Sequence, residues 1–502
     1  MELFSNLAMG FGVASSLANL AFCLIGVLLG TLIGVLPGIG ATATIAMLLP
    51  ITFQLEPVSS LIMLAGIYYG AQYGGSTTAI LINMPGESSS AVTAIDGYQM
   101  ARKGKAGTAL ATAAIGSFVA GTISTFLVAI FAPPLTTIAL KFGAAEYFSL
   151  MVMGLVMAVA LAHGSVLKAL AMVVLGLLLG LVGTDIYTGA PRFTMGITQF
   201  ADGLNFVAVA VGVFGIAEIL RNLEDEHDRQ VMTKNINRLF PTGAELRQMV
   251  GPVLRGTGIG SVLGILPGGG AILASFASYT VEKKLSDHPE EFGRGALAGV
   301  AGPESANNAG AQTSFIPLLT LGIPANPVMA LMIGAMIIQG IVPGPNVVTD
   351  QPQLFWGIVA SMWIGNLMLV VLNLPLIGLW VKLLTVPYYV LFPIIMAMCS
   401  IGVYSVNSNV YDLFAVAFFG LLGYVLVKLR FEPAPLLLGF VLGPLLEENL
   451  RRAMILSRGD PMTFVERPIS LGLLVASALV LALVFLPQIR QRREEVFTES
   501  DA

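Results

Sequence analysis

The sequence predicts an all-α polytopic membrane protein of two related halves, with roughly 11–13 transmembrane segments in which helices are broken or form re-entrant hairpins. The first observation is composition: of 502 residues, 56% are hydrophobic and 11% are charged, against about 25% charged in soluble domains. The second is that 3–55, 106–140 and 305–349 contain no Asp, Glu, Lys or Arg. Each stretch exceeds the roughly 20 apolar residues that cross a bilayer. The third is an internal repeat.

Apolar runs recur along the whole chain. They fall at about 12–36, 57–84, 107–132, 145–163, 166–184, 204–220, 252–281, 296–320, 325–345, 353–381, 388–407, 410–427, 433–446 and 469–487. They predict a first membrane half over 1–220, a polar linker over 221–251, a second half over 252–446, and a C-terminal loop, final transmembrane helix and tail over 447–502. The start of the chain lacks the basic region of a cleaved signal peptide, so we expect the first run to stay as an anchor.

Basic residues predict which loops face the cytoplasm, because cytoplasmic loops of membrane proteins carry an excess of Lys and Arg. The linker, the segment 102–105 and the tail at 490–493 are basic, and we place them inside. Arg451, Arg452 and Arg458 compete with this assignment. The sequence therefore leaves the topology of the last third open.

The sequence also argues against several functional classes. It has no basic stripe with interleaved aromatic residues, so nucleic acid is not an expected partner. It has no His-Glu-x-x-His zinc motif, no Walker A loop and no Gly-x-Ser-x-Gly elbow, so we predict neither an enzyme nor a bound metal or cofactor. Cys23 and Cys399 lie in apolar runs and suggest no disulfide or metal framework.

Three motifs recur in the same order in the second half of the chain. Gly34–Gly40 returns as Gly264–Gly270, Gly70–Gln72 as Gly310–Gln312, and Asn83–Gly86 as Gly322–Ala325, at offsets of 230, 240 and 239 residues. Collinear matches at nearly constant spacing indicate a duplicated unit, and many secondary transporters are built from two such halves. Whether the halves are inverted depends on the parity of the crossings between them, which the apolar runs leave open.

The first repeated motif is expected to break a transmembrane helix, because its proline removes a helical hydrogen bond and its glycines permit non-helical dihedral angles. A half-helix that starts after the break would present N–H groups and the positive end of its dipole to an anion. The candidate substrate-binding residues here are Gly38, Gly40, Thr42, Gly268 and Gly270. The freed carbonyls of Leu36 and Leu266 are candidates for holding a coupling cation. The alternative is a proline kink used only for packing.

The other repeated segments are rich in small hydroxyl and amide residues, whose donors suit a carboxylate and whose oxygens suit Na⁺. The candidate substrate-binding residues are Ser76, Thr77, Asn83, Pro85, Gly86, Asn307, Asn308, Thr313, Pro324 and Asn326. Glu87 and Glu304 lie in these segments and are candidates for binding a coupling cation or carrying a proton. The alternatives are close helix–helix contacts for the small residues and ordinary loop carboxylates for the two acids.

With these motifs the sequence resembles the large membrane subunit of the tripartite tricarboxylate transporter family. The resemblance extends from about Gly30 to about Pro444, and its most specific parts are Gly34–Gly40, Asp96–Gly107, Pro303–Asn308 and Gly322–Pro324. It implies a multi-pass protein of the bacterial inner membrane that works with a small membrane subunit and a periplasmic solute-binding protein. It also implies import of tricarboxylates or related carboxylates by symport with an ion, Na⁺ being the usual one. The binding protein would largely choose the substrate.

Two other functions remain open from the residues alone. An anion channel would share the broken helices but would conduct without a gradient-coupled cycle, and a counterflow assay in proteoliposomes separates the two. An intramembrane enzyme would need a nucleophile–base pair or a metal constellation, and the sequence shows neither.

Overall fold

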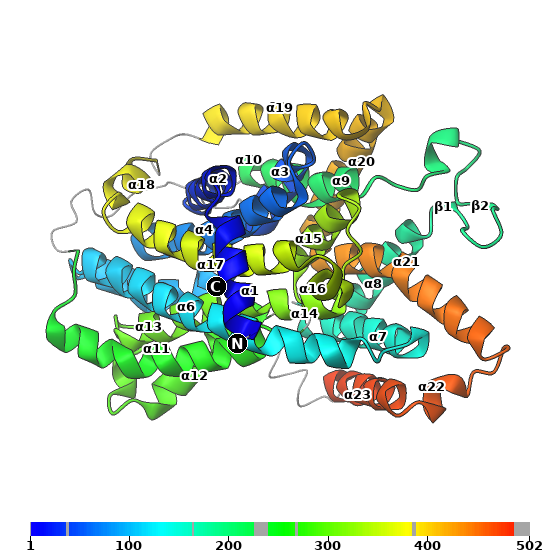
Figure 1. The fold of residues 1–502 in the computed structure, drawn as a ribbon. Coiled ribbons are helices and arrows are strands. Elements are labelled where there is room, and N and C mark those ends of the chain that lie inside the picture. Colours follow the sequence, from blue (N-terminus) through cyan, green and yellow to red (C-terminus); the bar gives the residue numbers. More distant parts are fainter. Residues whose placement is uncertain are drawn as a thin grey trace.

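The fold is helical over nearly its whole length, which confirms the prediction of an all-α membrane protein (Figure 1). The computed structural model describes residues 2–36, 40–162, 165–224, 239–266, 270–383 and 388–485. Within these ranges the only strands are β1 (Gly183–Thr184) and β2 (Pro191–Arg192), which pair antiparallel in one short hairpin.

The first half of the chain forms helices that are interrupted at two places. Its elements are α1 (Glu2–Ala14), α2 (Leu17–Gly34), α3 (Ala41–Thr52), α4 (Pro57–Ile82), η1 (Ser88–Ser90), α5 (Ala91–Arg102) and α6 (Ala106–Ala139). One interruption, between α2 and α3, coincides with the Leu-Pro-Gly motif. The other follows α4, which ends at Asn83 in a left-handed conformation with φ of 58°.

A middle group of elements follows α6 and precedes the second half. They are α7 (Ala144–Leu161), α8 (Val166–Gly180), the β1–β2 hairpin, η2 (Thr198–Phe200), α9 (Phe206–Ala210), η3 (Val211–Ile216) and α10 (Ala217–Glu224). The π-helical stretch η3 joins α9 to α10, so that Phe206–Glu224 forms one membrane-length helix.

The second half repeats the order of the first. Its elements are α11 (Gly243–Leu263), α12 (Gly270–Leu285), η4 (Pro289–Glu291), α13 (Ala298–Thr313), α14 (Phe315–Leu321), α15 (Pro327–Ile338), α16 (Asn346–Asp350) and α17 (Pro352–Asn373). Gly322, with φ of 71°, ends α14 in the same left-handed conformation in which Asn83 ends α4. The remaining helices are α18 (Ile377–Leu383), α19 (Tyr388–Asn407), α20 (Val410–Lys428), α21 (Pro433–Leu456), α22 (Thr463–Glu466) and α23 (Pro468–Phe485).

Seven helical stretches in the described ranges are long and apolar enough to cross a membrane without interruption. They are α2, α6, α7, the continuous α9–α10 stretch, α17, α20 and α23. Some of the remaining apolar runs are cut by the breaks into shorter helices such as α3 and α15, whereas the run at 57–84 forms one continuous helix, α4. The breaks are thus one reason why the sequence shows more apolar runs than there are unbroken apolar spans.

The duplication is visible in how the helices approach one another. In each half, three glycines one helical turn apart lie so close to the next helix that a Cβ atom would fall within 2.5 Å of a backbone carbonyl oxygen. The pairs are Gly26 with Met63, Gly30 with Ile67 and Gly34 with Ala71 in α2 and α4, and Gly256 with Gly302, Gly260 with Ala306 and Gly264 with Gly310 in α11 and α13. Ala71 and Gly310 occupy equivalent places in the two halves, because they contact Gly34 and Gly264 respectively. The sequence match, which aligned Gly70 with Gly310, is therefore wrong by one residue.

The two halves run in opposite directions. Along α4, Tyr69 lies beside Phe315 with ring centroids 5.9 Å apart, and Ser76 bonds Glu304 at 2.7 Å. Residue numbers therefore rise along α4 while those of its partners fall, so α4 is antiparallel to α13 and α14. The glycine contacts make α2 parallel to α4 and α11 parallel to α13. The structure thus decides what the sequence left open: the repeats are inverted.

Each Leu-Pro-Gly break turns the chain back toward the end from which it came. Arg255 of α11 pairs with Glu282 near the end of α12 at 2.8 Å, so α11 and α12 form a re-entrant hairpin. In the first half, Ser59 in the first turn of α4, the helix after α3, bonds Asn19 near the start of α2 at 2.6 Å. Because the halves are inverted, the two hairpins enter from opposite ends of the molecule.

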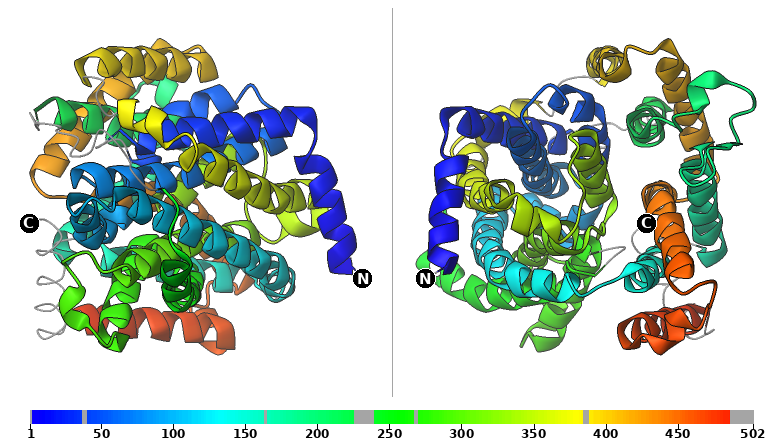
Figure 2. Two further views of the ribbon diagram at one scale, coloured as in Figure 1. Left: turned by 90° about the vertical axis from the view of Figure 1, so that its left-hand side faces the viewer. Right: turned by 45° about the vertical axis from the view of Figure 1, so that its right-hand side comes forward.

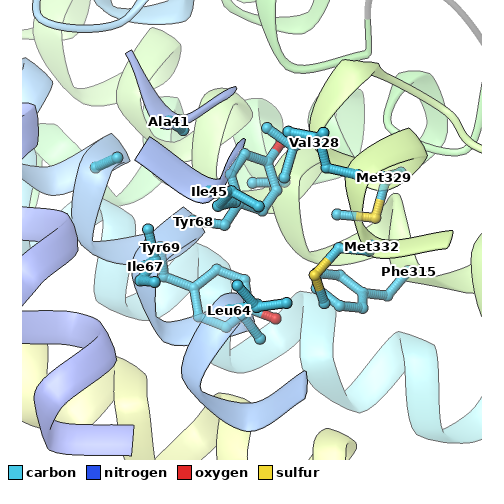
Figure 3. Close-up of a cluster of buried hydrophobic side chains, with 14 of the residues drawn as sticks. Ala41, Ile45, Leu64, Ile67, Tyr68, Tyr69, Phe315, Val328, Met329 and Met332 are labelled. Carbon is cyan, nitrogen blue, oxygen red and sulfur yellow. The ribbon is translucent and has the colours of Figure 1, made fainter. Parts of the chain in front are cut away.

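A buried apolar cluster joins the two halves (Figure 3). It combines Ile45 of α3 and Leu64 of α4 with Val328 and Met332 of α15. All four side chains are buried. Close packing of such side chains, rather than their removal from water, holds helices together in a membrane, so this contact helps to fix the centre of the fold, where the polar residues discussed below are held.

Helices α8, α20, α21 and α23 lie on one side of the molecule, opposite α1, α11 and α17 (Figure 2). Within this group α8 and α21 are parallel, since Gly176 approaches Leu436 and Gly180 approaches Phe440. Lys168 bonds the carbonyl of Leu429 at 2.6 Å, close to the start of α21. Asp185 pairs with Arg451 at 2.8 Å at the other end. The basic residues 451–458 therefore lie at the opposite end from Lys168.

Candidate functional site

The N-terminus of α3, which the sequence predicts to attract an anion, holds the protein's own carboxylate. Glu87 Oε2 accepts a hydrogen bond from the Ala41 N–H at 2.7 Å. A Cβ atom at Gly40 would lie 3.1 Å from that carboxylate, and one at Gly86 would lie 2.0 Å from the carbonyl oxygen of Gly34. Gly86 is thus required for the close approach of the 83–87 segment to α2, whereas a side chain at Gly40 would only have to displace the Glu87 carboxylate slightly. Glu87 is more than an ordinary loop carboxylate.

The second half differs at the equivalent position. Asn326 stands 239 residues after Glu87, and its Oδ1 accepts from the Met329 N–H of its own helix at 2.9 Å. Its Nδ2 donates to the Tyr68 hydroxyl of α4 at 3.2 Å. Asn326 therefore caps α15 and not α12, which begins at Gly270. Two candidates in the hairpin tips, Gly38 and Gly268, lie outside the described residues.

Glu304 is fully buried within α13 and lies between the two halves. Its Oε2 accepts from the hydroxyl of Ser76 at 2.7 Å, and its Oε1 accepts from the hydroxyl of Thr93. The loop-carboxylate alternative is therefore wrong for Glu304. Buried charges need compensating partners, and in the described part of the chain these hydroxyls, rather than a Lys or Arg, supply them.

The two adjacent amides of α13 have different surroundings. Asn308 Nδ2 donates to Ser117 of α6 at 2.7 Å and to the Glu304 carbonyl at 3.1 Å. Asn307 is completely buried, yet neither its Nδ2 nor its Oδ1 has a hydrogen-bond partner among the described residues. An unpaired buried amide costs about 1–3 kcal/mol, and such groups in native proteins call for an explanation.

The position of Asn307 on α13 suggests that explanation. It follows Pro303 by one helical turn, and the Pro303 carbonyl accepts from Ser275 of α12 at 3.3 Å. It precedes Gly310 by one turn, and Gly310 lies against Ala271 at the start of α12. Asn307 is therefore on the side of α13 that faces the first turns of α12.

The other candidates are spread around this centre. Thr77 and Thr313 donate to carbonyl oxygens of their own helices, at 3.3 and 3.0 Å. Pro324 is buried, whereas Asn83 and Pro85 are exposed. Thr42 lies in the first turn of α3 and is partly exposed. Leu36 and Leu266 each donate their N–H to the last turn of the preceding helix, which leaves their carbonyls at the hairpin tips.

Sequence reasoning missed several residues that the fold brings to the centre. Thr93 and Ser117 bond Glu304 and Asn308, and each looks like an ordinary small residue in its own helix. Asn373 is buried at the end of α17 with its Oδ1 unpaired among the described residues. A lone amide in an apolar run was the one sequence signal that could have identified it.

A small cavity, with room for about one water-sized particle, opens beside Glu304, between α4, α6, α13 and the α17–α18 junction. Its polar lining consists of Tyr73, Ser76, Thr77, Ser117, Glu304 and Asn373. The rest of the lining is apolar and comes from α6 and α18. The cavity thus combines one carboxylate with neutral oxygen groups.

Inverted halves with opposed re-entrant hairpins and polar residues at their meeting point are the architecture of a secondary transporter. The chain matches the model of the tripartite tricarboxylate transporter TctA family over residues 20–438. It belongs to this family and is a multi-pass membrane protein, the large subunit of a tripartite tricarboxylate transporter. The resemblance inferred from its motifs is confirmed.

Two curated relatives come from Agrobacterium vitis. One is described as an uncharacterized 52.8 kDa protein in the TAR-I ttuC' 3'region, and it is 67% identical over 501 residues, covering 100% of both chains. The other, an uncharacterized protein in the TAR-II ttuC' 3'region, is 67% identical over 242 residues, which are 48% of this chain and 100% of the relative. No solved structure matches the chain.

Proposed function

We propose that this subunit imports small carboxylates, tricarboxylates or related acids, across the bacterial inner membrane together with a periplasmic solute-binding protein and a small membrane subunit, by symport with Na⁺. The observation that carries the proposal is Asn307, whose amide is buried and unpaired beside the first turns of α12. A substrate carboxylate at this position would accept a hydrogen bond from the Asn307 Nδ2 and meet the positive end of the α12 dipole.

The first half shows that the fold can hold a carboxylate in this way. Glu87 binds the N-terminus of α3 through the Ala41 N–H. In the inverted half the equivalent residue is Asn326, which carries no charge and is engaged with α15 and Tyr68. Of the two hairpin helices, α12 rather than α3 therefore has an N-terminus suited to binding the carboxylate of a substrate.

The positions of the basic residues orient the molecule in the proposed membrane. Lys428 pairs with Glu224 at 2.6 Å, so the end of α20, the start of the basic linker and Lys168 share one end of the molecule. Excess Lys and Arg marks that end as cytoplasmic. Arg451 lies at the opposite end, where it is neutralised by Asp185 and Glu447.

Proteoliposomes test the proposal. The three components together should accumulate labelled carboxylate when Na⁺ is added outside at fixed pH, and this chain alone should not do so at the same rate and selectivity. Counterflow of labelled substrate against unlabelled substrate should occur, since a carrier exchanges and a channel does not. Undiminished uptake by this chain alone would refute the three-component assignment, and indifference to Na⁺ with a response to a proton gradient would refute Na⁺ coupling.

A further inference from the structure

The cavity beside Glu304 has the chemistry of a cation site. It offers the Glu304 carboxylate, the amide oxygen of Asn373 and the hydroxyl oxygens of Ser76, Thr77 and Ser117. No Lys, Arg or His is among the described residues that line it. An anionic substrate would find a carboxylate and no positive group here, so the cavity suits a positive ion.

A second observation points to a ligand in the same place. Asn373 is 4% exposed, its Nδ2 donates to the Leu369 carbonyl at 2.9 Å, and its Oδ1 has no partner among the described residues. That unpaired acceptor belongs to a residue that lines the same cavity as the buried carboxylate. The hydroxyls of Ser76 and Thr93 bond the carboxylate but leave its negative charge without a positive partner among the described residues, and a buried acceptor without a partner is unfavourable. A cation in this cavity would neutralise the carboxylate and give the Asn373 Oδ1 a partner.

We propose that Glu304 and Asn373, with the hydroxyl oxygens around them, form the binding site of the coupling Na⁺. This rests on the proposed symport and places the ion away from the Leu36 and Leu266 carbonyls at the hairpin tips. One carboxylate among neutral oxygens matches a single positive charge, whereas divalent ions such as Ca²⁺ are held by several carboxylates. In the described part of the chain no cluster of three acidic, His or Cys side chains exists that would suit a divalent metal.

The site also connects the ion to both halves. Glu304 belongs to the second half, and the hydroxyls that bond it come from Ser76 of α4 and Thr93 of α5 in the first half. Asn307 and Asn308 follow Glu304 on α13 by about one turn. An ion bound at Glu304 would therefore order the helix that presents Asn307 to the substrate, which is a direct route for coupling.

The test measures Na⁺ binding without transport. Thermal unfolding of the purified full-length protein in detergent is followed while NaCl replaces KCl or N-methylglucamine chloride at constant ionic strength. The wild type should show a saturable, Na⁺-specific rise in Tm. Asn373→Ala and Glu304→Gln should each weaken the apparent Na⁺ affinity by about tenfold or more. Asn373→Asp keeps an oxygen in place and should retain Na⁺ binding.

Matched controls lie on the same helices. Ser305→Ala, next to Glu304, and Ser361→Ala, on α17, remove buried hydroxyls that bond only their own helices and do not line the cavity. Both should keep the wild-type response to Na⁺. If Glu304→Gln does not fold, Asn373→Ala still tests the site, because among the described residues the Asn373 side chain bonds only the Leu369 carbonyl of its own helix.

Equal Na⁺ stabilisation of wild type and Asn373→Ala would overturn the proposal by placing the ion elsewhere. A second outcome would also overturn it: the Tm of the wild type does not respond to Na⁺ but depends on pH, and Glu304→Gln abolishes this pH dependence. The site would then carry a proton. If only the location of the site is wrong, uptake remains driven by Na⁺. If the proposed symport itself is wrong, uptake does not depend on Na⁺, so the two failures are distinguished.

Discussion

The hydroxyl of Ser76 donates a hydrogen bond of 2.7 Å to Glu304 Oε2 across the boundary between the two inverted halves. The two residues are 228 positions apart, and both are buried. Residues of both halves therefore contribute to the buried polar centre around Glu304. Changes on either side should therefore affect transport while leaving the separate halves packed.

Ser76→Ala and Asn308→Ala should each raise the apparent KM or the Na⁺ requirement of uptake by roughly tenfold, because each removes a donor from the buried centre at a cost of about 1–3 kcal/mol. The measurement is initial uptake against substrate and Na⁺ concentration, in protein shown to be folded by its elution profile in detergent. Substitution of Arg247, in the polar segment before α11's apolar part, should leave both parameters unchanged. Wild-type kinetics in both alanine variants would assign the two residues to packing.

Asn307→Ala should reduce carboxylate affinity without lowering Tm, because the amide it removes has no partner in the described fold. Asn307→Asp should abolish uptake, since it would place a negative charge beside the substrate carboxylate. Asn366→Ala is the contrasting variant: Asn366 bonds Tyr73 and the Phe118 carbonyl, each at 2.8 Å, so its loss should lower Tm. A marked fall in Tm for Asn307→Ala, with normal affinity, would show that Asn307 is structural.

Gly260→Ala should destabilise the second hairpin, because its Cβ would lie 2.2 Å from the Ala306 carbonyl oxygen. Overpacking of this kind typically costs about 1–3 kcal/mol. Gly30→Ala should behave alike, since its Cβ would lie 2.2 Å from the Ile67 carbonyl oxygen in the inverted half. Gly258→Ala is the control on the same helix: its Cβ meets nothing within 4 Å, so better helix propensity should leave Tm equal or higher. Equal Tm for Gly260→Ala and Gly258→Ala would contradict the close packing.

The β1–β2 hairpin should depend on the ionised form of Asp185. Backbone N–H bonds from Thr188 and Tyr187, together with Arg451, lower the pKa of Asp185 to about 2. Because the pKa is lower in the folded state, the stabilisation is present above the unfolded value of about 3.9 and is lost as the pH falls from there toward 2. Hydrogen exchange over 183–203, corrected for intrinsic rates, should be faster in Asp185→Asn at pH 7 and unchanged in Asp202→Asn. Equal protection in Asp185→Asn would refute this role.

The membrane class, the duplication and the break positions could be read from local pattern. Uncharged runs longer than a bilayer, prolines that cannot continue a helix, and three collinear motifs depend only on neighbouring residues, and the structure confirms the helical fold and the broken segments. Glu304 and Asn308 could be named as candidates because polar groups in apolar surroundings need partners. Their partners Thr93 and Ser117 could not, since they lie 211 and 191 residues away in sequence.

The amino-acid sequence by itself determined that this protein lies in a membrane, that it is helical and that it has two related halves, because hydropathy, charge and proline positions act locally. Only the tertiary structure decided that the halves are inverted, that Glu87 occupies the N-terminus of α3 while α12 has no such carboxylate partner in the described chain, and that Asn373 shares a cavity with Glu304. These facts depend on which distant helices pack together. That choice is made by the close glycine contacts between helix backbones and by the buried side chains joining the halves, whose partners no local pattern specifies.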